Sequence, residues 1–207
     1  MNLYIKRHIR LSFKSSAEIS DFYRSMQIDY PKFFKMDGLS KLGLIASETL
    51  LNDKENRFEP CEDTAVICFN RSSSLEIDTK YQGTISDDKN YFPSPSLFVY
   101  TLPNIVTGEI AIRNKFLGET SFYISENFNA TQMVEIVENA FFDKSTRQVL
   151  LGWIENFEGN YEVLMAFVTT EKCDMEFTKE QLKKAKNGIC SIVSVIEKKE
   201  SITGGEN

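Results

Sequence analysis

The segment that decides the fold reads SLFVYTLPNIVTGEIAIRNKFLGETSFYISEN and covers residues 96–127. Its apolar spacing is helical, but Pro103 interrupts it. Proline lacks a backbone N–H donor and its ring clashes with the preceding turn. The sequence therefore predicts two helical pieces separated at Pro103. After Gly118, the alternating pattern of TSFYISE predicts a short strand over residues 120–126.

Strand and helix patterns alternate on both sides of this segment. Strands are predicted over 2–13, 64–70, 147–157 and 161–171, and amphipathic helices over 17–26, 39–53, 130–142 and 180–199. Gly159 and Asn160 predict a hairpin turn between the last two strands. This order predicts an α/β fold with a mixed, mainly parallel five-stranded sheet, helices on both faces and one antiparallel hairpin. We expect a single domain over 1–200 and a flexible tail over 201–207.

The composition excludes several classes of protein. A net charge of −6 argues against binding to nucleic acid or to an anionic membrane surface. No apolar run is long enough to span a bilayer, and the N-terminus lacks the apolar core of a signal peptide, so we expect a cytoplasmic protein. One histidine, and four cysteines without CxxC spacing, predict neither a metal site nor a cofactor. The cysteines are interpreted as small buried apolar residues: Cys61, Cys68, Cys173 and Cys190.

Several short motifs follow one another in a recognisable order. They are Lys35, Met36 and Asp37 before a helix, Pro103 and Asn104, the small-residue helix 108–113, Leu117 and Gly118, and finally Gly152 and Glu155 in VLLGWIE. This order resembles the N-terminal half of β-ketoacyl-acyl-carrier-protein synthases, the condensing enzymes of the thiolase fold. The resemblance covers about residues 35–168 and implies a thiolase-like half-fold. Trp153 and Ile154 depart from the Gly-Gly-Thr-Glu that usually ends the VLLGWIE strand.

The resemblance also implies what the chain lacks. In the family, the strand after the Leu-Gly turn ends at an elbow with a catalytic cysteine, whose pKa the next helix lowers. An ungapped comparison puts Asn127 at the cysteine position, with Glu126 as its neighbour, and neither side chain can form an acyl thioester. The family's second half supplies the histidines that activate the malonyl thioester, whereas the one histidine here, His8, lies in the first strand. We therefore expect a catalytically inactive protein.

The same resemblance implies binding surfaces. The residues expected to line an acyl channel or binding groove are Phe98, Pro103, Asn104 and Gly108. In the family the elbow strand pairs with its equivalent across a two-fold axis, and here that strand carries no proline or lysine guard. We therefore expect a homodimer, or a heterodimer with an intact ketoacyl synthase. The edge residues that would pair are Thr120, Phe122, Tyr123, Ile124 and Ser125.

These observations favour a non-catalytic partner subunit, like a chain-length factor, in fatty-acid, aryl-polyene or polyketide-type biosynthesis. A first alternative is a module that binds acyl carrier protein or an acyl ligand, with basic residues facing the acidic carrier. Those residues are Lys6, Arg7, Arg10, Arg113 and Lys115. A second alternative is an acyltransferase whose chemistry has moved to Glu126 or Ser125. A half-fold should also expose an apolar helix face, unless charges have made that face polar or another chain covers it. The charged positions on the relevant helices are Lys41, Glu48, Glu135 and Glu138.

Overall fold

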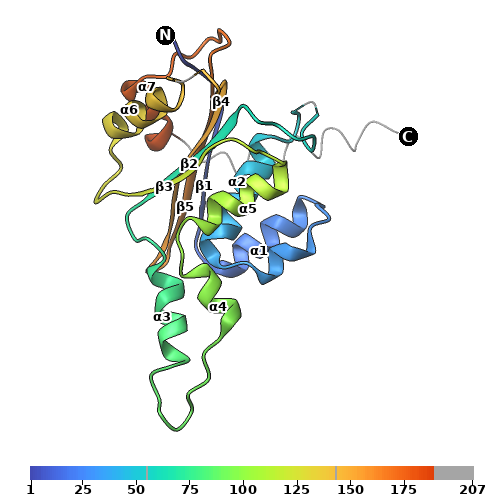
Figure 1. The fold of residues 1–207 in the computed structure, drawn as a ribbon, viewed down its shortest axis with the longest axis vertical. Helices are drawn as coiled ribbons and strands as arrows, with labels where there is room; N and C mark the ends of the chain where they lie inside the picture. The colour runs from blue at the N-terminus through green and yellow to red at the C-terminus, as the bar shows by residue number, and fades with distance from the viewer. Residues whose placement is uncertain (55, 143, 189–207) are drawn as a thin grey trace.

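The computed structural model describes residues 1–54, 56–142 and 144–188. Five strands form one sheet in the order β1-β5-β4-β2-β3 (Figure 1). Their bounds are β1 (Tyr4–Phe13), β2 (Thr64–Asn70), β3 (Thr120–Ile124), β4 (Gln148–Phe157) and β5 (Asn160–Thr169). The predicted tail 201–207, Cys190 and the last part of the predicted C-terminal helix lie outside the described residues.

The sheet is mixed, as the sequence predicts, but parallel pairs do not predominate. β2 pairs in parallel with β3 and β4, whereas β5 pairs antiparallel with both β4 and β1. Four strands therefore run in one direction and only β5 runs in the other. The predicted antiparallel hairpin is confirmed as β4–β5, and a second antiparallel pair arises because β1 joins the sheet beside β5.

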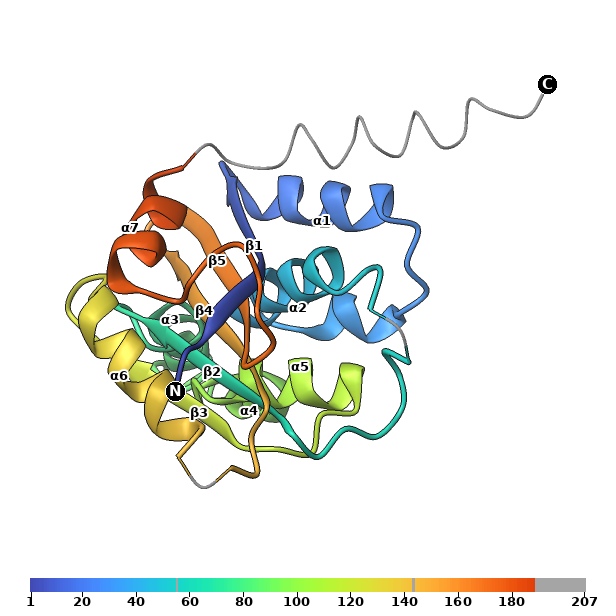
Figure 2. The same ribbon diagram turned by 90° about the horizontal axis from the view of Figure 1, so that it is seen from above.

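Helices cover both faces of the sheet (Figure 2). α1, α2 and α5 lie on one face, and α6 and α7 lie on the other. α3 and α4 form an arm that projects beyond the sheet (Figure 1). The bounds are α1 (Ser16–Ser25), α2 (Gly38–Leu50), α3 (Leu75–Gly83), α4 (Pro95–Tyr100), α5 (Ile105–Asn114), α6 (Ala130–Ala140) and α7 (Lys179–Asn187), with a 3-10 helix η1 (Pro31–Lys35).

Local sequence signals set the helix ends. The Asp37 carboxylate accepts hydrogen bonds from the Leu39 and Ser40 N–H groups and so caps α2. The Asn129 side chain accepts from the Gln132 N–H and caps α6. The break at Pro103 is confirmed, because α4 ends at Tyr100 and α5 begins at Ile105.

The hairpin between β4 and β5 turns one residue earlier than predicted. Phe157 and Asn160 form the last pair of the ladder, so the two-residue loop consists of Glu158 and Gly159. Both have positive φ, 52° and 77°, as a type I′ hairpin turn requires. Asn160 therefore begins β5 instead of belonging to the turn.

The sheet separates two apolar cores. β2 is buried along its whole length, with Val66 and Cys68 in the core under α2 and α5, and Ile67 and Phe69 in the core under α6 and α7. This burial on both faces explains why TAVICFN is apolar without alternation. Among the described residues, no helix is long and apolar enough to span a membrane.

The two helical layers differ in the surface that they present to solvent. The outer side of α6 is polar, with Thr131, Glu135, Glu138 and Asn139 exposed. Large exposed apolar side chains instead gather on α4, α5, the α5–β3 connection and β3, namely Phe98, Val99, Leu102, Ile112, Leu117 and Ile124. The apolar surface expected of a half-fold is therefore present, but beside β3 rather than over α6.

Candidate functional site

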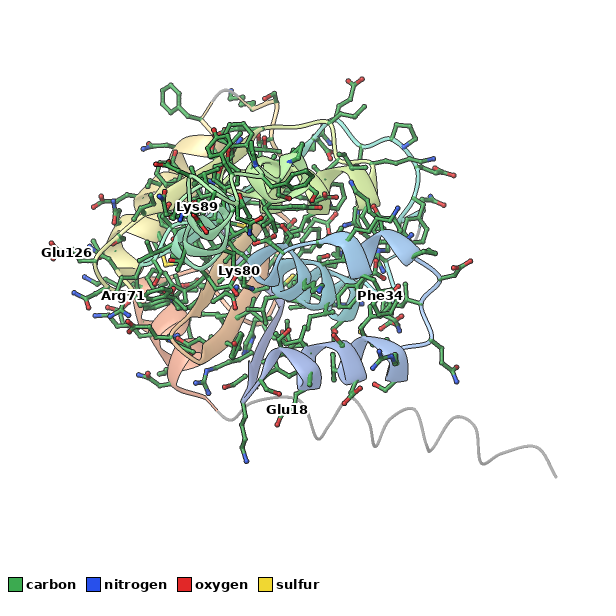
Figure 3. All side chains as sticks on the ribbon, turned by 90° about the horizontal axis from the view of Figure 1, so that it is seen from below. Glu18, Phe34, Arg71, Lys80, Lys89 and Glu126 are labelled. Carbon is green, nitrogen blue, oxygen red and sulfur yellow. The ribbon has the colours of Figure 1, made fainter. Side chains whose placement is uncertain are left out.

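The loop of residues 125–129 joins β3 to α6 at the end of an edge strand. The Ser125 N–H donates to the Asn70 carbonyl at 2.9 Å, which continues the β3–β2 ladder by one bond. The Ser125 hydroxyl then donates to the Asn127 carbonyl at 3.0 Å and tightens the bend. Glu126 and Asn127 are exposed, and Figure 3 shows Glu126 at the outer rim of the molecule. We call this loop the elbow.

The elbow contains no thiol, and the described cysteines lie elsewhere. Cys68 is inside β2, where burial raises its pKa to about 12, so it is not a nucleophile at neutral pH. Cys61 is only half-buried, before β2, and its thiol donates to Asp63 Oδ1 at 3.1 Å. Cys173 is half-buried after β5. The interpretation as buried apolar residues therefore fits Cys68 and not Cys61 or Cys173.

An aromatic contact anchors the elbow to the sheet. Phe128 packs edge-to-face on Trp153 of β4, with 5.5 Å between ring centroids. Lys186 of α7 lies 5.7 Å from the Phe128 centroid and 5.8 Å from that of Trp153, and it forms an ion pair with Glu162. Sequence reasoning treated Trp153 only as a departure from the family motif. Its role required knowledge that β4 passes beneath the elbow.

Glu155 holds the neighbouring loop. It lies near the end of β4, is 2% exposed, and its Oε2 accepts a hydrogen bond from the Arg71 N–H at 3.0 Å. Arg71 directly follows β2, so this contact fixes the chain where it leaves the sheet towards α3. Gly152 is equally constrained, since a Cβ there would lie 3.1 Å from the Cys68 sulfur. Both residues that the resemblance singled out in β4 thus have structural roles.

The four residues predicted to line a channel do not converge on the elbow. Phe98 is 54% exposed on α4 and packs against Tyr81 at a centroid distance of 5.4 Å. Pro103 and Asn104 form the turn between α4 and α5. Gly108 lies on the outer side of α5 and lines a shallow hollow of about 320 Å³. Their assignment to an acyl channel stays a prediction.

A buried polar contact connects α4, α5 and η1. Glu109 of α5 accepts a hydrogen bond from the Tyr100 hydroxyl at 3.2 Å and pairs with the Lys32 ammonium at 2.6 Å. Burial, and then the Glu109 charge, raise the pKa of Tyr100 above its ordinary value. Tyr100 is therefore a hydrogen-bond donor at physiological pH. Because it donates to Glu109, it fixes α4 against the start of α5.

The basic residues proposed for carrier-protein binding are mostly engaged within the chain. Lys6 pairs with Glu171, and Arg7 with Asp53. Arg10 lies 3.6 Å from the Glu162 carboxylate, and Arg113 pairs with the buried Glu48 at 2.6 Å. The residues therefore do not form one cationic surface. His8 lies on β1, at the edge of the sheet opposite to the elbow strand.

The architecture is a mixed five-stranded sheet between two helical layers, with an elbow between the edge strand and a helix. No family model and no curated protein matches the sequence. Solved structures do match, and all of the most similar ones carry this fold.

One match is the ishigamide ketosynthase/chain length factor, with a TM-score of 0.68 and 16% identity over 84% of this chain and 64% of that chain. Another is the complex of the ketosynthase ApeO with its chain length factor ApeC from Xenorhabdus doucetiae, with a TM-score of 0.58 and 13% identity over 83% of this chain and 80% of that chain. A β-ketoacyl synthase from Burkholderia phymatum has a TM-score of 0.56 and 9% identity over 91% of this chain and 61% of that chain.

These comparisons establish the fold. The chain has the thiolase-like fold and is similar in structure to chains from ketosynthase/chain length factor complexes. It spans less than two thirds of the matched ishigamide and Burkholderia chains. The matched chain in the Xenorhabdus complex is of nearly the same length as this one, because the shared segment is 83% of one and 80% of the other.

Proposed function

We propose that this protein is a non-catalytic partner subunit of a ketosynthase, of the chain-length-factor kind, in fatty-acid, aryl-polyene or polyketide-type biosynthesis. The observation that carries the proposal is the elbow. A condensing enzyme must hold its acyl chain on a thiolate, whereas this elbow contains no cysteine and exposes Glu126 and Asn127 at its bend. We assign Asn127 to the position that the nucleophile takes in an active synthase.

The edge strand supports the partner role. β3 is the outermost strand of the sheet and carries Ile124, which is 57% exposed. An unguarded edge strand is a template for pairing with another chain. The fold is also shared with chains from a structure in which a ketosynthase is in complex with its chain length factor. We propose that residues 120–125 pair with the corresponding strand of a ketosynthase.

An acyltransferase with relocated chemistry has less support. The Ser125 hydroxyl donates to the Asn127 carbonyl, and the one histidine of the sequence lies on the opposite edge strand. A serine nucleophile needs an adjacent base to take its proton. Binding of carrier protein alone also has less support, because Lys6, Arg7 and Arg113 are in ion pairs within the chain.

Co-expression tests the proposal. The tagged chain is produced together with each ketosynthase encoded in the same genome, and the purified complex is incubated with acyl-acyl-carrier-protein. We expect one ketosynthase to co-purify in equimolar amount, and intact-mass spectrometry to find the acyl adduct on the ketosynthase only. An acyl adduct on this chain, or failure of every ketosynthase to co-purify, would contradict the proposal.

A further inference from the structure

We propose that the hollow on the outer side of α5 is a docking site for one specific part of the partner: the apolar segment of a ketosynthase-fold subunit that corresponds to α4. This inference rests on the proposed function and deepens it, because it names the surface outside the edge strand that recognises the partner.

The hollow is apolar and open. It has a volume of about 320 Å³, and a Cβ built on Gly108 would meet no atom within 4 Å. Two large side chains at its margin, Ile112 and Leu117, are 66% and 62% exposed. Exposed apolar residues that are contiguous mark interaction sites more often than single ones do. The residues that line the hollow include Pro60, Gly108, Ala111, Ile112, Phe116 and Leu117.

α4 presents the complementary feature, a projecting apolar element. None of its six residues is buried, although it reads PSLFVY, and Phe98 and Val99 are about half exposed. Tyr100 turns inward to Glu109, so the helix is fixed while its other side chains stay outside the core. Leu102, just after the helix, is also exposed. The chain's own core therefore does not account for the apolar composition of α4.

The hollow and α4 lie at opposite ends of β3. α5 begins next to α4 and ends at Asn114, and the chain then pairs Phe116 with Cys61 before β2 and β3 begin. α5 therefore runs antiparallel to β3, with α4 near the C-terminal end of the strand and the hollow near its N-terminal end. A five-residue strand such as β3 spans about 17 Å, and a ten-residue helix such as α5 spans about 15 Å. The distance from α4 to the hollow along α5 is therefore close to the length of β3.

Antiparallel pairing of two such strands brings these features together. The two-fold axis of this pairing is perpendicular to the sheet, so the helical layers of both subunits that contain α5 lie on the same side. The C-terminal end of each β3 then lies beside the N-terminal end of the other. The α4 segment of one subunit consequently comes next to the hollow of its partner. Ile124, on the same face as Phe122, lies between them.

The size of a stable interface also requires contacts outside the edge strand, and the hollow is the apolar surface beside β3 that can supply them. Specific complexes bury about 1,200–2,000 Å² in total, more than a five-residue strand provides. Other surfaces are less suitable for this role. The outer side of α6 is polar, and the start of the β1 edge is already covered, because the Ile5 N–H donates to the Met175 carbonyl and the Phe177 N–H donates to the Leu3 carbonyl.

The test uses the co-expressed complex. Ile112→Glu places a charge in the hollow, and Thr131→Glu places the same charge on the outer side of α6 as a matched control. We expect Ile112→Glu to weaken ketosynthase binding at least tenfold and Thr131→Glu to leave it unchanged, with identical circular dichroism spectra for both variants. Wild-type affinity in Ile112→Glu would overturn the inference.

A second measurement does not depend on the folding of a variant. A photo-crosslinking phenylalanine analogue at position 112 should crosslink to the ketosynthase segment that leads into the helix before its own elbow strand, and the analogue at position 131 should not. Crosslinks to any other ketosynthase segment would overturn the inference while leaving the proposed function intact. If light scattering shows a homodimer that Ile112→Glu dissociates, the hollow holds a second copy of this chain and the ketosynthase is the wrong occupant. If no ketosynthase binds the wild type, the proposed function fails first.

Discussion

Replacing Glu48 should destabilise the protein strongly, because this buried carboxylate neutralises the buried Arg57 and the partly buried Arg113. Glu48 lies on α2 and is 3% exposed. Its Oε1 is 2.6 Å from Arg113 Nε of α5 and 2.9 Å from Arg57 Nη2. Arg57 is itself buried, and burial lowers its pKa while the Glu48 charge acts in the opposite direction. Glu48→Gln leaves both guanidinium groups in place without their counter-charge.

The expected loss is about 3–5 kcal/mol, the cost of removing one partner of a buried ion pair. The free energy of unfolding of a native domain is about 5–15 kcal/mol, so this loss is a large part of it. For a chain of this length each kcal/mol lowers Tm by about 2–4 °C, so the melting temperature should fall by roughly 6–20 °C. Glu171→Gln is the control: Glu171 pairs with Lys6 at 3.0 Å in solvent, and its loss should cost less than about 1 kcal/mol.

Urea unfolding measured by the fluorescence of Trp153 provides the assay. Trp153 is the only tryptophan, and it is buried in the core on the other face of the sheet, so it reports unfolding without touching the mutated site. A free-energy difference between Glu48→Gln and wild type no larger than that of Glu171→Gln would refute the reasoning. Replacing the whole cluster by Glu48→Met, Arg57→Met and Arg113→Met should restore most of the stability, since no buried charge is then left unpaired.

Three further outcomes are expected. Iodoacetamide should label Cys173 in the native protein and Cys68 only after unfolding, and labelling of native Cys68 at pH 8 would contradict this. The pKa of Cys68 is about 12 in the folded state and 9.0 in the unfolded state, so the unfolded state loses its proton first and the free energy of unfolding should fall as pH rises above 9. Gly159→Ala should cost about 1 kcal/mol because φ is +77°, whereas Gly83→Ala, with open space at its Cβ, should stabilise α3 by about 0.4–1 kcal/mol in the same urea assay. Asn127→Cys should gain no acyl adduct from acyl-acyl-carrier-protein by intact-mass spectrometry, because the position precedes a helix whose N-terminus is already capped; an adduct would show that only the thiol was missing.

Features fixed by neighbouring residues could be predicted from the sequence. The cap at Asp37, the cap at Asn129 and the break at Pro103 each depend on side chains and backbone within a few residues. The hairpin was predicted one residue too late, because its register depends on the pairing of Phe157 with Asn160 across the whole ladder and not on the turn residues alone.

Features that join distant segments could not be predicted. The pairing of β1 with β5 brings together residues that are more than 140 positions apart, and no local pattern records it. The Glu48 cluster joins α2, α5 and an irregular segment in the same way. The sequence also could not show where the apolar surface of a half-fold lies, since periodicity shows that a helix has an apolar side but not whether its own sheet covers that side.

The position of the elbow does not depend on the side chain at position 127. Its position depends on Phe128 packing against Trp153 and on the capping of α6 by Asn129, and neither contact involves the residue at position 127. A cysteine at this position would change the stability of the fold little, because residue 127 is exposed in the bend. The identity of the side chain at position 127 is therefore nearly neutral for folding. By contrast, the exposed apolar side chains of Ile112, Leu117 and α4 lower the solubility of the isolated chain, because apolar surface in contact with water favours aggregation. Under the proposed function a partner covers this surface beside β3, and the contact offsets that loss of solubility.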